Sequence, residues 1–142
     1  MKRRIILISA LLVFALVSPA SAAEMTVMLK PGPDGKGASG TAVIRDKAGM
    51  KEVAITMSGL KPDAVYTVWL VNKGHTGLGK PDYDFKADSK GNAVYAATIA
   101  REEIEKWEGL DIVRHPDGNP KNMKNIKSAL KGELKKPAAG GY

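Results

Sequence analysis

Apolar and polar residues alternate along much of the chain, in short runs that glycine and proline separate. Over residues 53–58, Val, Ile and Met alternate with Ala, Thr and Ser, which is the period of a strand with one buried face. Comparable short runs predict further strands at 25–30, 40–46, 83–87, 93–99 and 110–113. Their close spacing, with turns between them, favours an antiparallel β-sandwich over alternating βαβ units.

One run differs from the others because it is apolar at nearly every position. It extends from Tyr66 to Val71, and such a pattern is typical of a central strand that is covered on both faces. We expect Trp69, in its middle, to lie in the core. The following residues, 74–81, predict a long loop, and residues 88–92 predict a hairpin turn in which glycine or asparagine takes a positive φ.

Two segments have a helical pattern. Residues 101–108 predict a short helix that Gly109 ends. We expect Ile104 and Trp107 to pin this helix to the sheet, with Trp107 as an exposed contact for a partner as the alternative.

A second helix is predicted at about 120–135, after a cap at Asn119 and with Pro120 at its first position. One apolar stripe with helical spacing supports it, formed by Met123, Ile126, Leu130 and Leu134. The chain after residue 136 is expected to be a mobile tail.

The first 22 residues have the pattern of a cleavable signal peptide. Three basic residues precede an apolar run at 5–17, and Ala20-Ser21-Ala22 matches the small-residue cleavage pattern. Thirteen residues at ~1.5 Å each span only ~20 Å, which is short of a ~30 Å hydrocarbon core. We therefore expect cleavage after Ala22 or Ala23, export to the periplasm or the extracellular space, and no transmembrane span in the mature chain. The predicted domains are a β-sandwich at 24–116 and a basic helix with a mobile tail at 117–142.

Positive charge is concentrated near the C-terminal end of the sequence. The chain carries a formal charge of +7, and three basic residues lie in the predicted signal peptide. Five lysines recur every three or four residues along the predicted helix: Lys121, Lys124, Lys127, Lys131 and Lys135. They predict either a solvated face or a contact surface for anionic lipid, polysaccharide or an acidic protein. Nucleic acid does not fit an exported protein.

A proline and a tyrosine mark a corner between two sheets. Leu60, Pro62 and Tyr66 have the spacing of the tyrosine corner in fibronectin type III-like and immunoglobulin-like sandwiches. In this arrangement Pro62 fixes the turn, Leu60 fills the core, and the Tyr66 hydroxyl bonds to a backbone carbonyl that the corner would otherwise leave without a partner. Together with Trp69 these residues are structural candidates, and they indicate a fold rather than a function.

A longer pattern between residues 58 and 119 resembles the extracytoplasmic C-terminal domain of anti-sigma-K-type factors. It consists of Gly59-Leu60 with Pro62, Tyr66 with Trp69-Leu70-Val71, Phe85 with Asp88, Gly91 and Ala93, and Pro116-Asp117-Gly118. In that family the domain is joined to a membrane helix and a cytoplasmic domain that holds a sigma factor. The pattern here contains neither, so the resemblance implies the sandwich alone.

The segments 27–30, 40–42 and 58–60 are similar to the opening of copper–zinc superoxide dismutases. That family has a histidine pair on the following strand, further histidines and a disulfide. Residues 66–71 contain no histidine and the chain has no cysteine. The similarity therefore implies a related architecture without dismutase activity.

Candidate chemistry is sparse. The chain has two histidines, and a transition-metal site needs three or four converging ligands. His75, Asp82 and His115 are the weak candidates for such a site, and no cofactor is expected. The methionines are better explained as core filling than as copper ligands.

These patterns together predict an exported, non-catalytic β-sandwich that serves as a binding or structural module of the cell envelope. Two alternatives stay open. One is an extracytoplasmic sensing domain similar to that of anti-sigma factors. The other is a metal-handling protein or enzyme that uses the loop at 74–84.

Overall fold

The structure is a computed structural model that describes residues 24–79 and 82–134. The predicted signal peptide, Lys135 and the predicted tail lie outside the described residues. Nine strands and one short helix make up the described chain: β1 Glu24–Pro31, β2 Ser39–Lys47, β3 Met50–Ser58, β4 Val65–Val71, β5 His75–Gly77, β6 Asp84–Lys86, β7 Ala93–Ala100, α1 Arg101–Ile104, β8 Gly109–His115 and β9 Lys127–Glu133.

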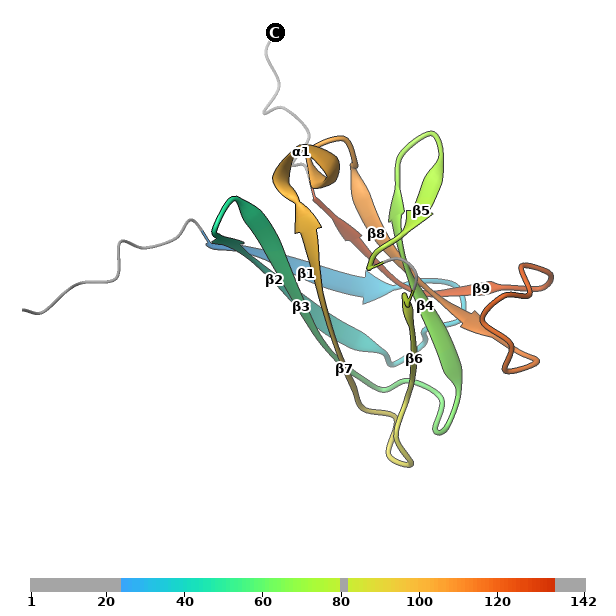
Figure 1. The fold of residues 1–142 in the computed structure, drawn as a ribbon. Helices are drawn as coiled ribbons and strands as arrows, with labels where there is room; N and C mark the ends of the chain where they lie inside the picture. Colours follow the sequence, from blue (N-terminus) through green and yellow to red (C-terminus); the bar gives the residue numbers. More distant parts are fainter. Residues whose placement is uncertain (1–23, 80–81, 135–142) are drawn as a thin grey trace, which may run out of the picture.

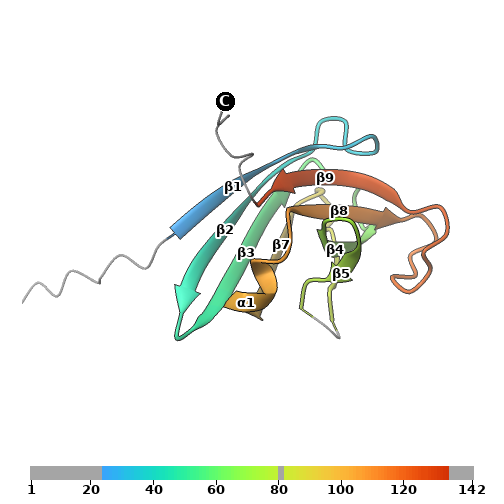
Figure 2. The ribbon, with the colours of Figure 1, turned by 90° about the horizontal axis from the view of Figure 1, so that it is seen from above.

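The strands form a single curled antiparallel sheet in the order β5-β4-β8-β9-β1-β2-β3-β7, and β6 also pairs with β4. Figures 1 and 2 show how the sheet curls, so that β1, β2, β3 and β7 (the four-stranded half) face β4, β8 and β9. The two halves join where β1 pairs with β9 through Lys30–Lys131 and Pro31–Leu130. The mainly antiparallel β architecture predicted from the sequence is confirmed.

In the four-stranded half, buried and outward-facing residues alternate along the strands. On β3, Val53, Ile55 and Met57 are buried, while the residues between them face outward. The neighbouring strands keep the same register, so that Ile55 lies between Ala42 on β2 and Tyr95 on β7. The inward side chains of this half share one core with those of the other half, including Val68, Leu70, Ile112 and Leu130.

β4 is covered on both faces, as its apolar run predicts. Residues 66–70 are all buried. Tyr66, Val68 and Leu70 belong to the main core, whereas Thr67 and Trp69 point to the opposite face. That second face is covered by two other parts of the chain, the loop 116–126 and the segment that holds His75 and Tyr83.

The predicted C-terminal helix is wrong over the residues that the structure describes. Residues 127–133 are strand β9, which pairs with both β8 and β1. Leu130 and Leu134 are buried, but Met123, which the helical stripe included, is exposed. A spacing of four residues is compatible with a strand as well as with a helix, because four is an even number of strand positions.

Asn119 and Pro120 therefore do not begin a helix. The Asn119 side chain accepts a hydrogen bond from the amide of Lys121 at 3.0 Å, and Asp117 accepts one from the amide of Asn119 at 2.9 Å. These are Asx turns, in which a side chain bonds to the backbone two residues on. They shape the loop 116–126 between β8 and β9.

Three smaller expectations also need correction. The predicted loop at 74–81 contains β5, which pairs with β4. The turn at 88–92 has the expected positive φ at Gly91, but it is not a hairpin, because β6 pairs with β4 and β7 pairs with β3. The helix α1 is four residues long, and Gly109 is already part of β8.

The chain crosses between the two halves three times. β3 leads to β4, the turn at 88–92 returns the chain to β7, and α1 leads on to β8. Ile104 of α1 is buried, and the partly buried Trp107 packs against the core, as the pinning role predicts. The described residues contain no helix with the length and hydrophobicity that a membrane span requires.

Candidate functional site

The predicted lysines do not form a ridge on a helix. Lys121 and Lys124 lie on the loop 116–126, and Lys127 and Lys131 lie on β9; all four are exposed. Lys127 pairs with Arg114 near one end of β8. The fifth candidate, Lys135, lies outside the described residues. The lysines are therefore spread over a loop and a strand rather than along one helical face.

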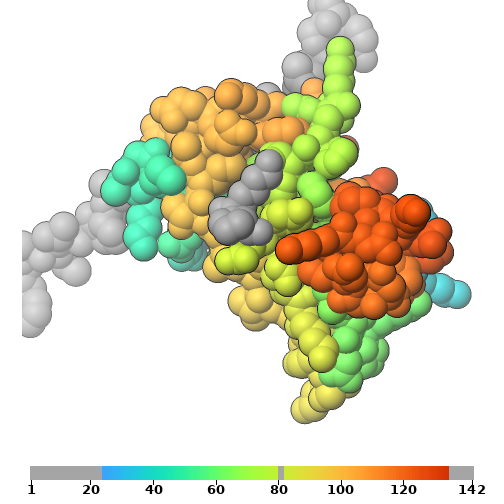
Figure 3. Space-filling model, turned by 45° about the vertical axis from the view of Figure 1, so that its right-hand side comes forward, coloured from blue at the N-terminus to red at the C-terminus, as the bar shows by residue number. Residues whose placement is uncertain are grey.

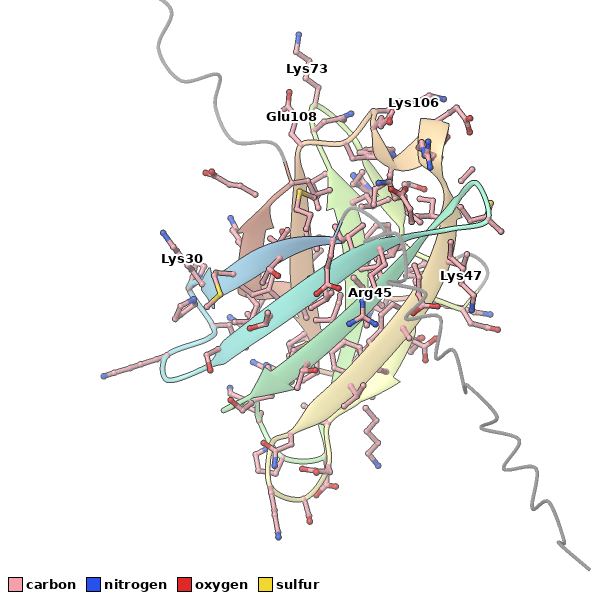
Figure 4. The ribbon with its side chains drawn as sticks, turned by 90° about the vertical axis from the view of Figure 1, so that its left-hand side faces the viewer. Lys30, Arg45, Lys47, Lys73, Lys106 and Glu108 are labelled. Carbon is pink, nitrogen blue, oxygen red and sulfur yellow. The ribbon has the colours of Figure 1, made fainter. Side chains whose placement is uncertain are left out.

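The structure instead brings together two lysines that are far apart in the sequence. Lys30 on β1 and Lys131 on β9 are direct cross-strand partners, and both are exposed. Neither forms an ion pair with another described residue. Like charges directly opposite each other destabilise a sheet. We call this pair the basic seam; Figure 4 shows Lys30 pointing away from the sheet.

His115 lies beneath the loop 116–126 and is only 2% exposed. Its Nε2 is 2.8 Å from the Thr67 hydroxyl on β4, and its Nδ1 is 3.0 Å from the carbonyl oxygen of Asn122. The Trp69 indole N–H donates to the same Thr67 hydroxyl at 2.7 Å. Figure 3 shows the loop, in orange-red, as a lobe on this face of the molecule.

The hydrogen-bond partners of His115 fix its tautomer. A carbonyl can only accept, so Nδ1 carries the proton that bonds to Asn122. The Thr67 hydroxyl accepts from Trp69 and can then donate to Nε2, which therefore accepts. Each polar atom has a partner when the ring is neutral and protonated on Nδ1. This buried network joins β4 to the loop and leaves neither nitrogen of His115 free.

The loop over His115 is held by Asp117. Its carboxylate accepts from the backbone amide of Asn119 and from the side-chain amide of Asn122 at 2.6 Å. These hydrogen bonds, with that of Asn119 the larger contribution, lower the pKa of Asp117. Asp117 thus positions the Asn122 carbonyl that His115 contacts.

His75 has a different environment, on the other side of Trp69. Its ring lies edge-on to the Trp69 ring at 5.0 Å between centroids, and Tyr83 lies against the same tryptophan at 4.9 Å. His75 is exposed. Gly77 is required here, because a Cβ would come within 2.4 Å of the Tyr83 ring. The result is an aromatic cluster that covers the second face of β4.

The weak metal candidates do not converge. His75 and His115 touch the same Trp69–Thr67 unit, but His115 is fully hydrogen-bonded, and the Asp82 side chain is exposed. The described residues contain no group of three or more His, Cys, Asp or Glu side chains arranged to hold a metal ion.

The Tyr66 hydroxyl bonds to the backbone as predicted, with one change in chemistry. Leu60 and Tyr66 are buried, Pro62 is exposed, and Trp69 is buried on the second face. The Tyr66 hydroxyl accepts a hydrogen bond from the backbone amide of Lys61 at 3.0 Å. The corner pattern predicts a bond to a carbonyl, whereas the hydroxyl bonds to an amide donor instead. Burial raises the pKa of the Tyr66 phenol.

An ion pair that the sequence pattern does not predict lies near Tyr66, at the same end of the sheet. The Arg114 guanidinium donates to both carboxylate oxygens of Asp34, at 2.7 and 3.1 Å, and both side chains are about nine-tenths buried. The hydrogen bonds from Arg114 lower the pKa of Asp34. The two residues are 80 positions apart, so no local motif could have signalled their contact.

Comparison with known proteins gives no guide to function. The chain matches no protein-family model, no curated protein and no solved structure.

Proposed function

We propose that the chain is an exported, non-catalytic module that adheres to an anionic surface of the cell envelope through the basic seam. The signal-peptide pattern at residues 1–22 supports export. The curled sheet, whose halves enclose one core, supports the immunoglobulin-like sandwich interpretation, and the hydrogen bond of Tyr66 to Lys61 fits the corner of such folds.

The observation that carries the proposal is the cross-strand pair Lys30–Lys131. The two exposed ammonium groups form no ion pair with a described carboxylate, and they repel each other. On its other side Lys131 is the cross-strand partner of Asp111 on β8, whose carboxylate accepts a hydrogen bond from Ser128. An anionic headgroup or sugar acid bound between them would remove that repulsion and add ~1 kcal/mol for each lysine near an anionic membrane. Lys121 and Lys124 add exposed positive charge on the loop 116–126, which leads into β9.

The non-catalytic part of the proposal is supported by how the titratable groups are used. A general base must reach a substrate proton, whereas both nitrogens of His115 bond within the fold. The most buried carboxylate among the ion pairs, Asp34, is committed to Arg114. Both groups support structure, which leaves surface binding as the better use of the exposed charges.

Flotation with liposomes tests the proposal. The mature protein should float with vesicles that contain phosphatidylglycerol at low salt, and recovery should fall at high salt, where charges are screened. A Lys30→Gln/Lys131→Gln variant should bind about 30-fold more weakly, which corresponds to ~2 kcal/mol.

The matched control is Lys86→Gln/Lys90→Gln, which removes the same charge from exposed positions elsewhere and should bind nearly as the wild type does. A sulfated polysaccharide column separates a sugar partner from a lipid partner. Equal recovery with neutral and anionic vesicles, together with no retention on the column, would contradict the proposal.

A further inference from the structure

A shallow groove crosses the outer face of the four-stranded half, on the side of the sheet that points away from the core. Its volume is about 390 Å³. The lining includes four side chains with hydroxyl groups and two large apolar ones: Ser39, Thr41, Thr56, Ser58, Met28 and Val94. Figure 4 looks onto this face of the sheet, with Lys30 at its left-hand end.

The register of the strands arranges most of these side chains in a row. Thr41 on β2 pairs with Met28 on β1 and with Thr56 on β3. Thr56 pairs in turn with Val94 on β7. Because residues directly opposite each other share one face of a sheet, these four side chains form a single row across four strands. At ~4.8 Å between neighbouring strands, the row is ~14 Å long.

The groove is uncharged, but it is not purely apolar. Ser39 and Ser58 form a second row beside the first, with their hydroxyl oxygens 3.1 Å apart. Met28 and Val94 are 64% and 74% exposed. No acidic or basic side chain is among the described residues that line the groove. Hydroxyl groups beside exposed methyl groups match a sugar ring, which presents hydroxyls at its edge and C–H groups on its face.

Lys30 supplies a positive charge at one end of the groove. It lies two residues after Met28 on β1, and residues two apart on a strand point to the same face. Lys30 forms no ion pair with a described residue. Farther along the same face, Glu24 and Arg45 form an ion pair at 3.0 Å. An anionic ligand in the groove would therefore have its counter-charge at the end that adjoins the basic seam.

We propose that the groove binds a chain of an acidic polysaccharide, which lies across the four strands with a carboxylate or sulfate group at Lys30. The serine and threonine hydroxyls exchange hydrogen bonds with sugar hydroxyls, and the two exposed apolar side chains pack against C–H groups of the rings. This inference rests on the proposed function, because Lys30 is half of the basic seam. It names a sugar chain as the anionic partner that gains contacts beyond the seam.

Two other occupants fit the groove less well. An extended peptide binds a sheet by adding a strand to a free edge, whereas β2 and β3, in the middle of the groove, are paired on both sides. A lipid tail would cover the serine and threonine hydroxyls without offering them a partner, which costs free energy. A sugar hydroxyl both donates and accepts hydrogen bonds, so it can serve each of these groups.

Tetragalacturonate and its methyl ester are matched probes, because they differ in the charge of their carboxyl groups. In amide NMR titrations of the mature protein, tetragalacturonate should shift the signals of Thr41, Thr56 and Val94, and the titration gives the dissociation constant. The neutral ester should shift the same signals and bind about fivefold more weakly, because it lacks the charge-assisted contact with Lys30.

A Ser39→Ala/Thr56→Val variant removes two hydroxyls from the groove and keeps every charge. It should bind tetragalacturonate about tenfold more weakly, yet float with phosphatidylglycerol vesicles as the wild type does. The matched control, Ser89→Ala/Thr98→Val, makes the same changes at exposed positions outside the groove and should bind tetragalacturonate as the wild type does.

Several results would overturn this inference. One is an equal dissociation constant for the wild type and Ser39→Ala/Thr56→Val. Another is a shift of the groove signals with protein concentration alone, which would show that a second copy covers the groove. Vesicle binding without a response to either oligosaccharide would overturn the inference and leave the proposed function standing. No response to vesicles, to the sulfated column or to either oligosaccharide would overturn both.

Discussion

At the scale of single residues, two polar clusters hold the molecule together. The Trp69–Thr67–His115–Asn122 network ties β4 to the loop 116–126, and the Asp34–Arg114 pair ties the β1–β2 connection to β8. In both clusters the polar atoms are buried but satisfied, which is the condition under which burying them is tolerable. Removing one partner should cost more than the hydrogen bond itself is worth.

Thr67→Val should destabilise the fold by about 2–4 kcal/mol, because it keeps the shape of the side chain but leaves Trp69 Nε1 and His115 Nε2 without partners. Urea unfolding at pH 7 measures the change. Thr56→Val is the matched control: Thr56 is exposed on β3, and its change should stay within about 0.5 kcal/mol. Equal effects of the two substitutions would show that the network contributes nothing to stability.

The pKa of Asp34 is lowered in the folded state, mainly by its hydrogen bonds from Arg114. A lowered carboxyl pKa stabilises the fold above the unfolded value of ~3.9, and this stabilisation disappears as the pH falls through the folded value. Asp34→Asn should therefore lower the free energy of unfolding by about 1–3 kcal/mol at pH 7, and by progressively less below pH ~4.

Unfolding measured between pH 2 and 7 tests this pH dependence. Asp63→Asn changes an exposed carboxylate and should leave the curve nearly unchanged. A loss for Asp34→Asn that is the same at every pH would contradict the proposed charge interaction.

At the scale of elements, the local alternation of residues predicted most strands but not β5 or β9. The pattern at 53–58 predicts β3, because the buried positions are separated by single outward ones. In β9 the apolar pattern is ambiguous, because Leu130 and Leu134 are four residues apart, a spacing that fits both a strand and a helix. A register shift near Val113 on the partner strand adds a buried Ala129 out of phase. Only pairing with β1 and β8 settles the strand.

Gly132→Ala distinguishes the helix and strand interpretations by the sign of its effect. In a helix the substitution would stabilise the protein by ~1 kcal/mol. In β9 the added Cβ would come within 2.6 Å of a Leu29 methyl and 2.8 Å of a Val27 methyl, so we expect destabilisation of about 1–3 kcal/mol.

Thermal or urea unfolding of the purified protein gives the sign directly. Gly74→Ala provides a control at an exposed position, where a Cβ would meet only an Asn72 oxygen at 3.8 Å. Stabilisation by Gly132→Ala would contradict the strand.

At the scale of the whole molecule, charge that is clustered in the sequence becomes distributed in space. The lysines from 121 to 131 look like one ridge in the sequence, yet the fold places them on a loop and a strand. The two lysines that do lie together, Lys30 and Lys131, come from β1 and β9, and no local sequence pattern can relate these two strands. The sequence thus indicated that the proposed binding surface is positively charged, and the sheet topology determines which lysines form it.

The most direct test maps the contact on the folded protein. Amide NMR spectra of the mature protein should be compared with neutral bicelles and with bicelles that contain phosphatidylglycerol. Our account predicts changes with the anionic bicelles at Lys30, along β9 and in the loop 116–126, and their loss in the Lys30→Gln/Lys131→Gln variant. Changes centred instead on β3 and β7, or the same changes with neutral bicelles, would contradict it.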